Sequence, residues 1–316
     1  MKTIKTISTG HKFYLAVFAA LVLLASSGKK LNEEEKESEP FAYAENIKFN
    51  HLFVVIDDST YAHLFDSIPF FRQFAYTNEG GVDTGEESWN GKYIFGNQDY
   101  LEIFRPGGAE NTELGDFGIG FMPNKLGVVD SLYDHWVEMS TDSIMKKQQT
   151  MVISVDDTIP WFNATAFDDP DSLRIAPWVM EYTETVMHMS GFNDEDLKRE
   201  ISHAEYSQQR FATKNNIPYD SAAYERLYEK VSALDLTLNK KELSLLRKYL
   251  ETFNFEENDG AFTRADFEIT YTPSDIEHRI LNQISFELRE SVPEQVYSTG
   301  KVSLSVKDNV AEMSFH

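Results

Sequence analysis

The stretch "FNHLFVVID", Phe49 to Asp57, places a single histidine near the start of a run of β-forming residues. Residues 47–56 are rich in β-branched and aromatic side chains and contain neither glycine nor proline, which predicts a buried strand. Asp57 can cap a helix after this strand, and Pro69 is expected to bend or break that helix. His51 is therefore either a metal ligand at a strand end or a packed, hydrogen-bonded histidine of the core.

A second strand is predicted in "DYLEIFRP", Asp99 to Pro106, after a shorter strand in "GKYIFG". If side chains alternate along it, Tyr100, Glu102 and Phe104 share one face. A carboxylate on the inner face of a sheet is costly unless it meets a metal, a cation or a hydrogen-bond donor. Glu102 is therefore either part of a site or turned toward solvent. "FGIGFM" predicts another strand, and residues 126–139 predict an amphipathic helix.

The same order of elements recurs near the end of the chain. "ALDLTL" predicts a strand, Asn239 and Glu242 form a capping-box pattern before a helix, and "DFEITYTP" and "QISFEL" predict strands. "DYLEIFRPGG" is similar to "DFEITYTPSD" in its opening aspartate, its alternation and its proline. The expected fold is α+β, with one module at 46–139, a divergent second module at 231–316, and a mostly helical insertion at 140–230. In that insertion "TMVISV" is an edge-strand candidate, and His203 is expected on a helix surface.

The first residues are typical of export rather than of a folded domain. A basic head, the apolar run "FYLAVFAALVLLA" and small residues up to Ser27 predict a signal peptide at 1–27. The alternative is a membrane anchor, but the run is shorter than the roughly 20 residues that a spanning helix needs. "LASS" looks like a lipoprotein signal with Ser27 in place of the lipidated cysteine, and the chain has no cysteine. We expect a protein of the periplasm or the cell exterior, with no membrane span after cleavage.

The chain is strongly acidic. Its 316 residues include 52 acidic and 29 basic ones, for a formal net charge of −23. Residues 28–45 read as an acidic, disordered leader. This charge argues against a nucleic-acid partner, because phosphates would be repelled. A small-molecule ligand is compatible with it, while the oligomeric state stays open.

The residues around His51 and Glu102 resemble the glyoxalase-like vicinal oxygen chelate superfamily and, within it, a bacterial family built on a domain of unknown function. The resemblance implies two βαβββ modules that form an open, barrel-like sheet. It also implies metal ligands on the first and last strands of each module, which here are His51 and Glu102. The later module departs from this pattern, because Asp235 is its only candidate on the first strand and Ile269 stands opposite Glu102. Oxygen and nitrogen ligands without sulfur favour Zn, Mn, Fe or Ni.

Two further metal ligands are candidates in "APWVMEYTETVMHM", residues 176–189. Glu181 and His188 lie seven residues apart, so they share a face if the segment is a helix. In a strand they point to opposite faces, and ordinary packing is the simpler interpretation. "DDPD", Asp168 to Asp171, is either a solvated loop or a weak calcium site. The chain lacks the P-loop and HExxH patterns.

Three functions follow from these patterns. The first is an exported glyoxalase-like protein that binds a small molecule between two modules. The second is a divalent-metal-dependent lyase, isomerase or dioxygenase that uses His51 and Glu102. The third is a protein-interaction module of the cell envelope. The sequence names neither substrate nor catalytic residues.

Overall fold

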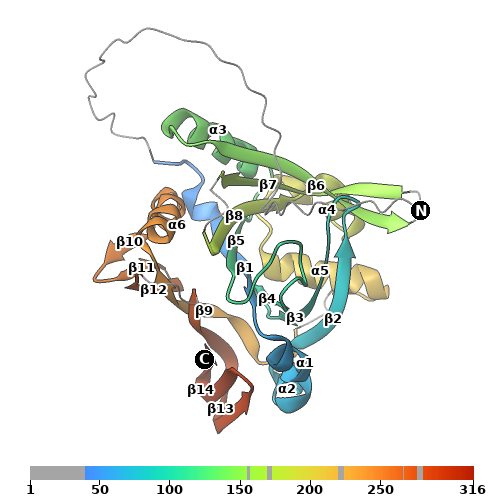
Figure 1. Cartoon of the computed structure of the whole chain (residues 1–316). Coiled ribbons are helices and arrows are strands. Elements are labelled where there is room, and N and C mark those ends of the chain that lie inside the picture. The colour runs from blue at the N-terminus through green and yellow to red at the C-terminus, as the bar shows by residue number, and fades with distance from the viewer. Residues whose placement is uncertain (1–39, 155–156, 169–172, 220–223, 266, 276–279) are drawn as a thin grey trace, which may run out of the picture.

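The computed structural model describes residues 40–154, 157–168, 173–219, 224–265, 267–275 and 280–316 (Figure 1). The expected signal peptide, the leader up to residue 39, and most of the "DDPD" segment lie outside the described residues. In the described part no helix combines the length and the apolar composition that crossing a membrane requires.

The first βαβββ module follows a short 3-10 turn, η1 (Ala44–Asn46). Its elements are β1 (Ile47–Val55), α1 (Asp58–Ser67), α2 (Phe71–Phe74), β2 (Tyr76–Asp83), β3 (Ser88–Phe95) and β4 (Tyr100–Phe104). The Asp57 carboxylate accepts a hydrogen bond from the Thr60 N–H and so caps α1. Helix α1 ends two residues before Pro69, as expected. The last strand, β4, lies parallel to β1.

A second βαβββ module follows directly. It comprises β5 (Phe117–Pro123), α3 (Val128–Met139), β6 (Ile144–Ser154), β7 (Asp157–Phe167) and β8 (Ile175–Tyr182). Strand β5 runs antiparallel to β1, and β8 lies parallel to β5 just as β4 lies parallel to β1. The two modules make one eight-stranded sheet in the order β2-β3-β4-β1-β5-β8-β7-β6. The sheet curls so strongly that its two edges come into contact. Thr150 Oγ1 on edge strand β6 donates a hydrogen bond to the carbonyl oxygen of Thr84, the residue after β2 (2.8 Å).

The segment 140–230 is therefore not mostly helical. It supplies three of the eight strands, and its helices are α4 (Glu184–Met189), η2 (Asp196–Lys198) and α5 (His203–Asn215). Strand β6 is an edge strand whose sequence, "IMKKQQTMVIS", is largely polar, so it lacks the apolar run of a central strand. Tyr228, which lies inside the segment expected to be mostly helical, begins a strand as well.

The third unit repeats the pattern in a sheet of its own. It contains β9 (Tyr228–Leu238), α6 (Lys240–Thr252), β10 (Glu256–Asn258), β11 (Ala261–Arg264), β12 (Phe267–Pro273), β13 (Leu281–Thr299) and β14 (Val302–Phe315). Strand β12 lies parallel to β9, and β13 lies antiparallel to it. The repeat seen in the sequence is thus present, and the capping box of α6 forms. However, this unit builds a separate six-stranded sheet rather than the other half of the barrel.

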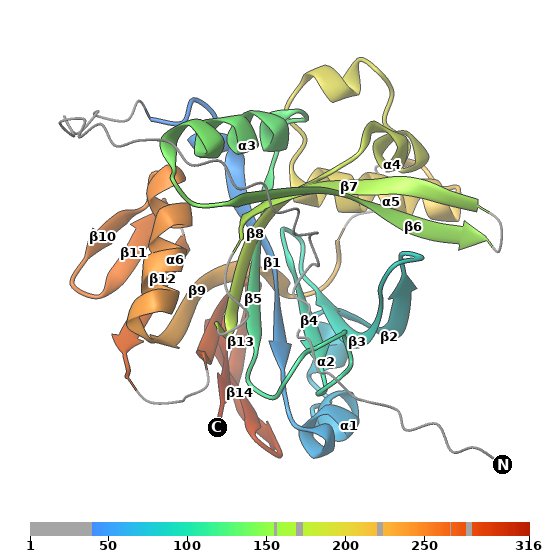
Figure 2. The same ribbon diagram turned by 45° about the horizontal axis from the view of Figure 1, so that its top comes forward.

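The two sheets share one hydrophobic core. Helix α6 lies between them (Figure 2), and on it Tyr249 packs edge-on against Trp136 of α3. Asp99, in the β3–β4 turn, accepts hydrogen bonds from the Tyr228 hydroxyl (2.5 Å) and the Val231 N–H (2.9 Å). These contacts fix the third unit against the outside of the curled sheet and leave its inner face free to form a site.

Candidate functional site

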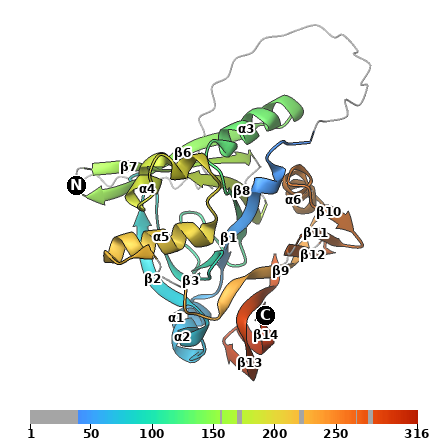
Figure 3. The ribbon, with the colours of Figure 1, turned by 180° about the vertical axis from the view of Figure 1, so that it is seen from behind.

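The inner face of the curled sheet encloses a cavity of about 900 Å³. Helix α5 runs along this side of the molecule (Figure 3), and several of its residues join the cavity wall. The wall is mainly apolar and contains many aromatic residues, among them Phe53, Trp89, Tyr93, Phe95, Tyr100, Phe104, Trp161, Phe162, Trp178, Tyr182 and Tyr206. A concave, mainly apolar pocket with a few polar groups is typical of a small-molecule site.

His51 lies in the wall of this cavity and is almost completely buried (4% exposed). Its ring stacks on Tyr100 with centroids 4.5 Å apart and meets Trp178 edge-on at 4.9 Å. On its other side it packs against Gly120, where an added Cβ would lie 2.5 Å from His51 Cε1. Burial, with a smaller contribution from His203, lowers the pKa of His51 to about 3. The imidazole is therefore neutral at physiological pH.

Asn50 connects His51 to a second histidine. A bulge in β1 between Phe49 and His51 interrupts the alternation of side chains. His51 Nδ1 lies 2.7 Å from Asn50 Oδ1, and Asn50 Nδ2 lies 2.9 Å from His203 Nδ1. Because a carboxamide oxygen only accepts, His51 carries its proton on Nδ1 and keeps a lone pair on Nε2.

His203 is not the surface residue that its helical sequence context suggested. It begins α5, just after the cap residue Ser202, and lines the cavity. Its Nε2 lies 3.2 Å from Ser207 Oγ, so Nε2 donates there while Nδ1 accepts from Asn50. Burial and the charge of Arg210 lower the pKa of His203 to about 4. The site thus contains two neutral histidines joined by one amide.

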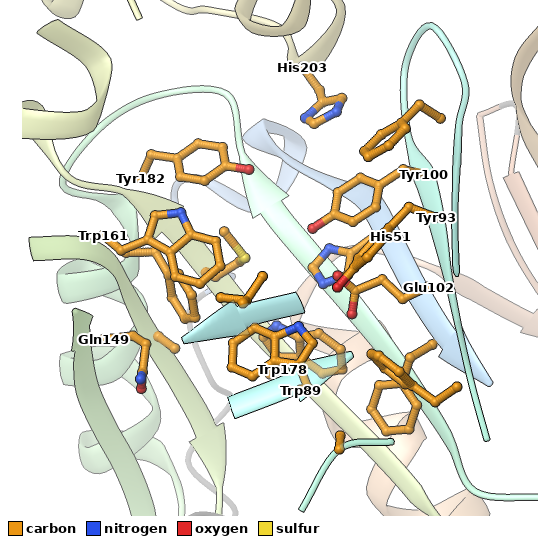
Figure 4. Close-up of a pocket in the computed structure, with 18 of the residues that line it drawn as sticks. His51, Trp89, Tyr93, Tyr100, Glu102, Gln149, Trp161, Trp178, Tyr182 and His203 are labelled. Carbon is orange, nitrogen blue, oxygen red and sulfur yellow. The ribbon is translucent and has the colours of Figure 1, made fainter. Parts of the chain in front are cut away.

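Glu102 lines the same cavity together with Tyr100 and Phe104, so the three residues share one face of β4, as the alternation predicted. Burial raises the pKa of Glu102 to about 8, so the carboxyl is mostly protonated at neutral pH. None of the hydrogen bonds or ion pairs formed among the described residues involves it. Figure 4 shows Glu102, His51 and Tyr93 pointing toward one another inside the cavity. The structure therefore brings two of the four predicted ligands together.

Glu181 and His188 lie elsewhere. Glu181 is on β8 between two cavity-facing residues, so its side chain points to the other face. There it accepts hydrogen bonds from Gly127 N and Val129 N (3.2 Å each) at the start of α3. His188 on α4 is 43% exposed, with Nδ1 3.0 Å from the Phe192 carbonyl oxygen and Nε2 3.4 Å from Asp194. Neither residue lines the cavity.

The residues present do not fit a complete metal site. At the level of His51 and Tyr100, the second module places Gly120 and Trp178, and its next cavity-facing residue on β8 is Met180. Asp235 lies on β9 in the other sheet. Among the described residues, no group of three or more His, Cys, Asp or Glu side chains is arranged to hold a metal ion. His51 and Glu102 alone are one ligand short of the usual three protein ligands of a catalytic centre.

Three polar atoms in the cavity wall are buried without a hydrogen-bond partner: Trp89 Nε1, Tyr93 Oη and Gln149 Nε2. Burial raises the pKa of Tyr93, so its phenol is neutral. The Trp89 N–H lies close to the Tyr93 hydroxyl and makes a small contribution that lowers the pKa of Tyr93. The two groups nevertheless do not form a hydrogen bond. The Trp89 ring stacks on Trp161 across the cavity, with centroids 6.0 Å apart. In the sequence, Trp89, Tyr93 and Gln149 are ordinary aromatic or polar residues of two separate strands. They come together only because the sheet curls, which the sequence alone did not reveal.

Solved structures similar to this chain include extradiol dioxygenases and a glyoxalase. An extradiol ring-cleaving dioxygenase from B. fuscum is 12% identical, with 73% of this chain and 55% of that chain covered and a TM-score of 0.36. Homoprotocatechuate 2,3-dioxygenase from Arthrobacter globiformis is 10% identical, with 75% and 62% covered and a TM-score of 0.37. The Mn(II)-bound glyoxalase from Novosphingobium aromaticivorans is 11% identical, with 83% and 77% covered and a TM-score of 0.38.

The chain spans just over half the length of the first of these dioxygenases. No curated protein matches it by sequence. A family model described as "Family of unknown function (DUF5829)" matches residues 49–315, which include all three βαβββ units, and the chain belongs to that family.

Proposed function

We propose that this protein binds a planar, mostly apolar small molecule in the cavity of the eight-stranded sheet. The observation that carries the proposal is the cavity of about 900 Å³ itself, with its aromatic side chains and, behind its surface, three unpaired polar atoms on Trp89, Tyr93 and Gln149. A buried polar group without a partner costs about 1–3 kcal/mol, and native proteins rarely leave several of them together. Because these atoms expose almost no surface, a bound molecule with oxygen acceptors would satisfy them only after a small shift of the wall.

The aromatic walls support a flat ligand over a flexible chain. Ring pairs in offset or edge-to-face contact contribute about 0.5–1.5 kcal/mol beyond the area that they bury. Tyr100 and Trp178 present such surfaces beside His51. Since His51 and Glu102 are both neutral in the folded protein, they can serve as hydrogen-bonding groups for a ligand at neutral pH.

A fluorescent apolar probe tests this proposal. N-phenylnaphthylamine, which emits strongly only in apolar surroundings, is expected to bind with one site per chain. Ala164→Phe should abolish this binding, because Ala164 lines the cavity and a phenyl ring would fill part of it. The matched control is Val137→Phe on the outer face of α3, where the side chain is 52% exposed. Equal binding by both variants would place the probe outside the cavity and contradict the proposal.

The metal-dependent lyase, isomerase or dioxygenase stays the second candidate, because His51 and Glu102 do share the cavity. It lacks a third ligand among the described residues. Elemental analysis of protein purified without added metal separates the candidates. Binding without catalysis predicts substoichiometric Zn, Mn, Fe and Ni. One metal per chain, lost in both His51→Ala and Glu102→Ala, would favour the enzyme.

We also propose that the protein acts after export. The support is the basic, apolar and small-residue order of residues 1–27 and the absence of cysteine from the chain. Mass spectrometry of the protein expressed in a Gram-negative bacterium should find an N-terminus near residue 28 in the periplasmic fraction. An intact Met1 in the cytoplasm would contradict export, and an intact Met1 in the membrane fraction would indicate an anchor.

A further inference from the structure

Helix α5 brings an arginine to the cavity that no carboxylate of the described chain neutralises. Arg210 lines the cavity, and it takes part in no ion pair among the described residues. The groups that influence its ionisation are Tyr206, Tyr182 and Tyr100. Its side chain is exposed to solvent as well as lining the cavity.

Lys147, another cation of the cavity wall, is in a different situation. Its Nζ lies 3.0 Å from Glu86 and 3.1 Å from Glu87, so its charge is already matched. Glu102 does not serve as a counter-ion for Arg210, because burial keeps its carboxyl mostly neutral. Lys214, one turn further along α5, is a second exposed cation of the cavity wall, and the wall also contains the carboxylates Glu110 and Asp168. Positive charge is therefore present at the side of the cavity formed by α5.

The unpaired polar groups indicate the rest of the ligand. The indole of Trp89 and the amide nitrogen of Gln149 can only donate hydrogen bonds, and the Tyr93 hydroxyl can donate as well. These atoms expose almost no surface to the cavity, so a ligand reaches them only if the wall shifts, and it then needs oxygen acceptors. A guanidinium group matches the two oxygens of a carboxylate with two parallel hydrogen bonds.

We propose that the cavity takes a planar aromatic carboxylate, with its acid group on Arg210 and its ring system between the aromatic walls. This assignment rests on the proposed function, because it specifies the chemistry of the molecule bound in the same cavity. It makes Arg210 the residue that selects the acid over neutral molecules of the same shape.

Calorimetric titration with naphthalene carboxylate and the isosteric naphthalene carboxamide tests the assignment. Wild-type protein is expected to bind the acid at least about tenfold more tightly than the amide, since hydrogen bonds to charged groups exceed neutral ones by that order. Arg210→Gln should weaken binding of the acid to the level of the amide and leave the amide unchanged. Arg210→Lys should retain part of the preference. Lys198→Gln, a change at an exposed lysine of η2, serves as the control and should bind both compounds like wild type.

The outcomes separate this assignment from the proposed function. Equal affinity of wild-type protein for acid and amide, or an equal loss of both in Arg210→Gln, overturns the role of Arg210 and leaves small-molecule binding intact. If wild-type protein binds neither these compounds nor the apolar probe, the proposed function fails together with the assignment. Binding of the amide by Arg210→Gln also shows that the variant has kept a folded cavity.

Discussion

Glu102 is a carboxyl group held in an aromatic cavity without a charged partner among the described residues, and this governs its chemistry. Burial raises its pKa from 4.5 to about 8, since the low polarity of the site disfavours the charged form. The protonated group can donate a hydrogen bond to a ligand. The alternation of residues along β4 predicted that Tyr100, Glu102 and Phe104 share one face, but not whether that face lines a site or meets solvent. Its protonation state depends on the surrounding strands and could not be predicted from the sequence.

The pH dependence of stability should report this carboxyl. The folded protein holds the proton up to about pH 8, whereas the unfolded chain releases it near pH 4.5. The stabilisation from neutral Glu102 is therefore complete below pH 4.5 and is lost as pH rises through 8. Wild-type protein should lose stability across this window relative to Glu102→Gln, as measured by urea unfolding at several pH values. Parallel curves for the two proteins would show that Glu102 is ionised in the folded state.

Asn50 is expected to be the most sensitive polar residue of the site. Asn50→Ala removes both partners of its amide and leaves a buried N–H on His51 and a buried lone pair on His203. The expected loss is about 2–4 kcal/mol in the free energy of unfolding, from about 1–3 kcal/mol for each unpaired group. Asn90→Ala on β3, where the side chain is exposed, should change stability by less than about 0.5 kcal/mol. Similar losses in both variants would contradict the bridge between the histidines.

At the scale of elements, the junction of β1 and β5 decides what the cavity can contain. His51 and Gly120 face each other across this junction, so one module supplies an imidazole and the other supplies space for it. The sequence predicted β1, β4, β5 and α3, because each has a clear period or an apolar run. It predicted the end of β6 as an edge strand in "TMVISV" but missed the strand-rich character of the second module, since most of β6 is polar and β8 runs directly into α4.

Gly120→Ala tests this packing. The new methyl group would lie 2.5 Å from His51 Cε1, so either the ring or the backbone must move. Overpacking of this kind costs about 1–3 kcal/mol, and it should also weaken binding of the apolar probe. Gly80→Ala on β2 provides the control, because the nearest atom to its added Cβ is the side-chain Nδ2 of Asn78 at 3.3 Å. A Gly120→Ala protein as stable as wild type would show that His51 is less tightly held than the structure indicates.

At the scale of the whole molecule, the chain uses the βαβββ pattern three times but closes only the first two copies into one sheet. The sequence similarity between β4 and β12 does reflect a structural repeat. Because of that similarity, residues 46–139 were expected to pair with residues 231–316, whereas the first module pairs with the segment that follows it directly. Nothing in a strand's own residues specifies which of two similar copies it will join. The third copy instead packs on the outside, where Phe74 stacks on Tyr228 at 5.1 Å and Phe121 approaches Phe253 at 5.1 Å.

This shared core predicts that both sheets unfold in one transition. All four tryptophans precede residue 180, so their fluorescence reports the eight-stranded sheet, while far-UV circular dichroism reports both sheets. The two urea curves should superimpose for wild-type protein. Asp99→Ala should shift both curves equally, by about 2–4 kcal/mol, because it leaves the Tyr228 hydroxyl and the Val231 N–H unpaired at the boundary. Asp134→Ala, at an exposed position of α3, should leave both unchanged. If Asp99→Ala instead separates the two curves, the third unit folds independently, and the cavity depends on the first two modules alone.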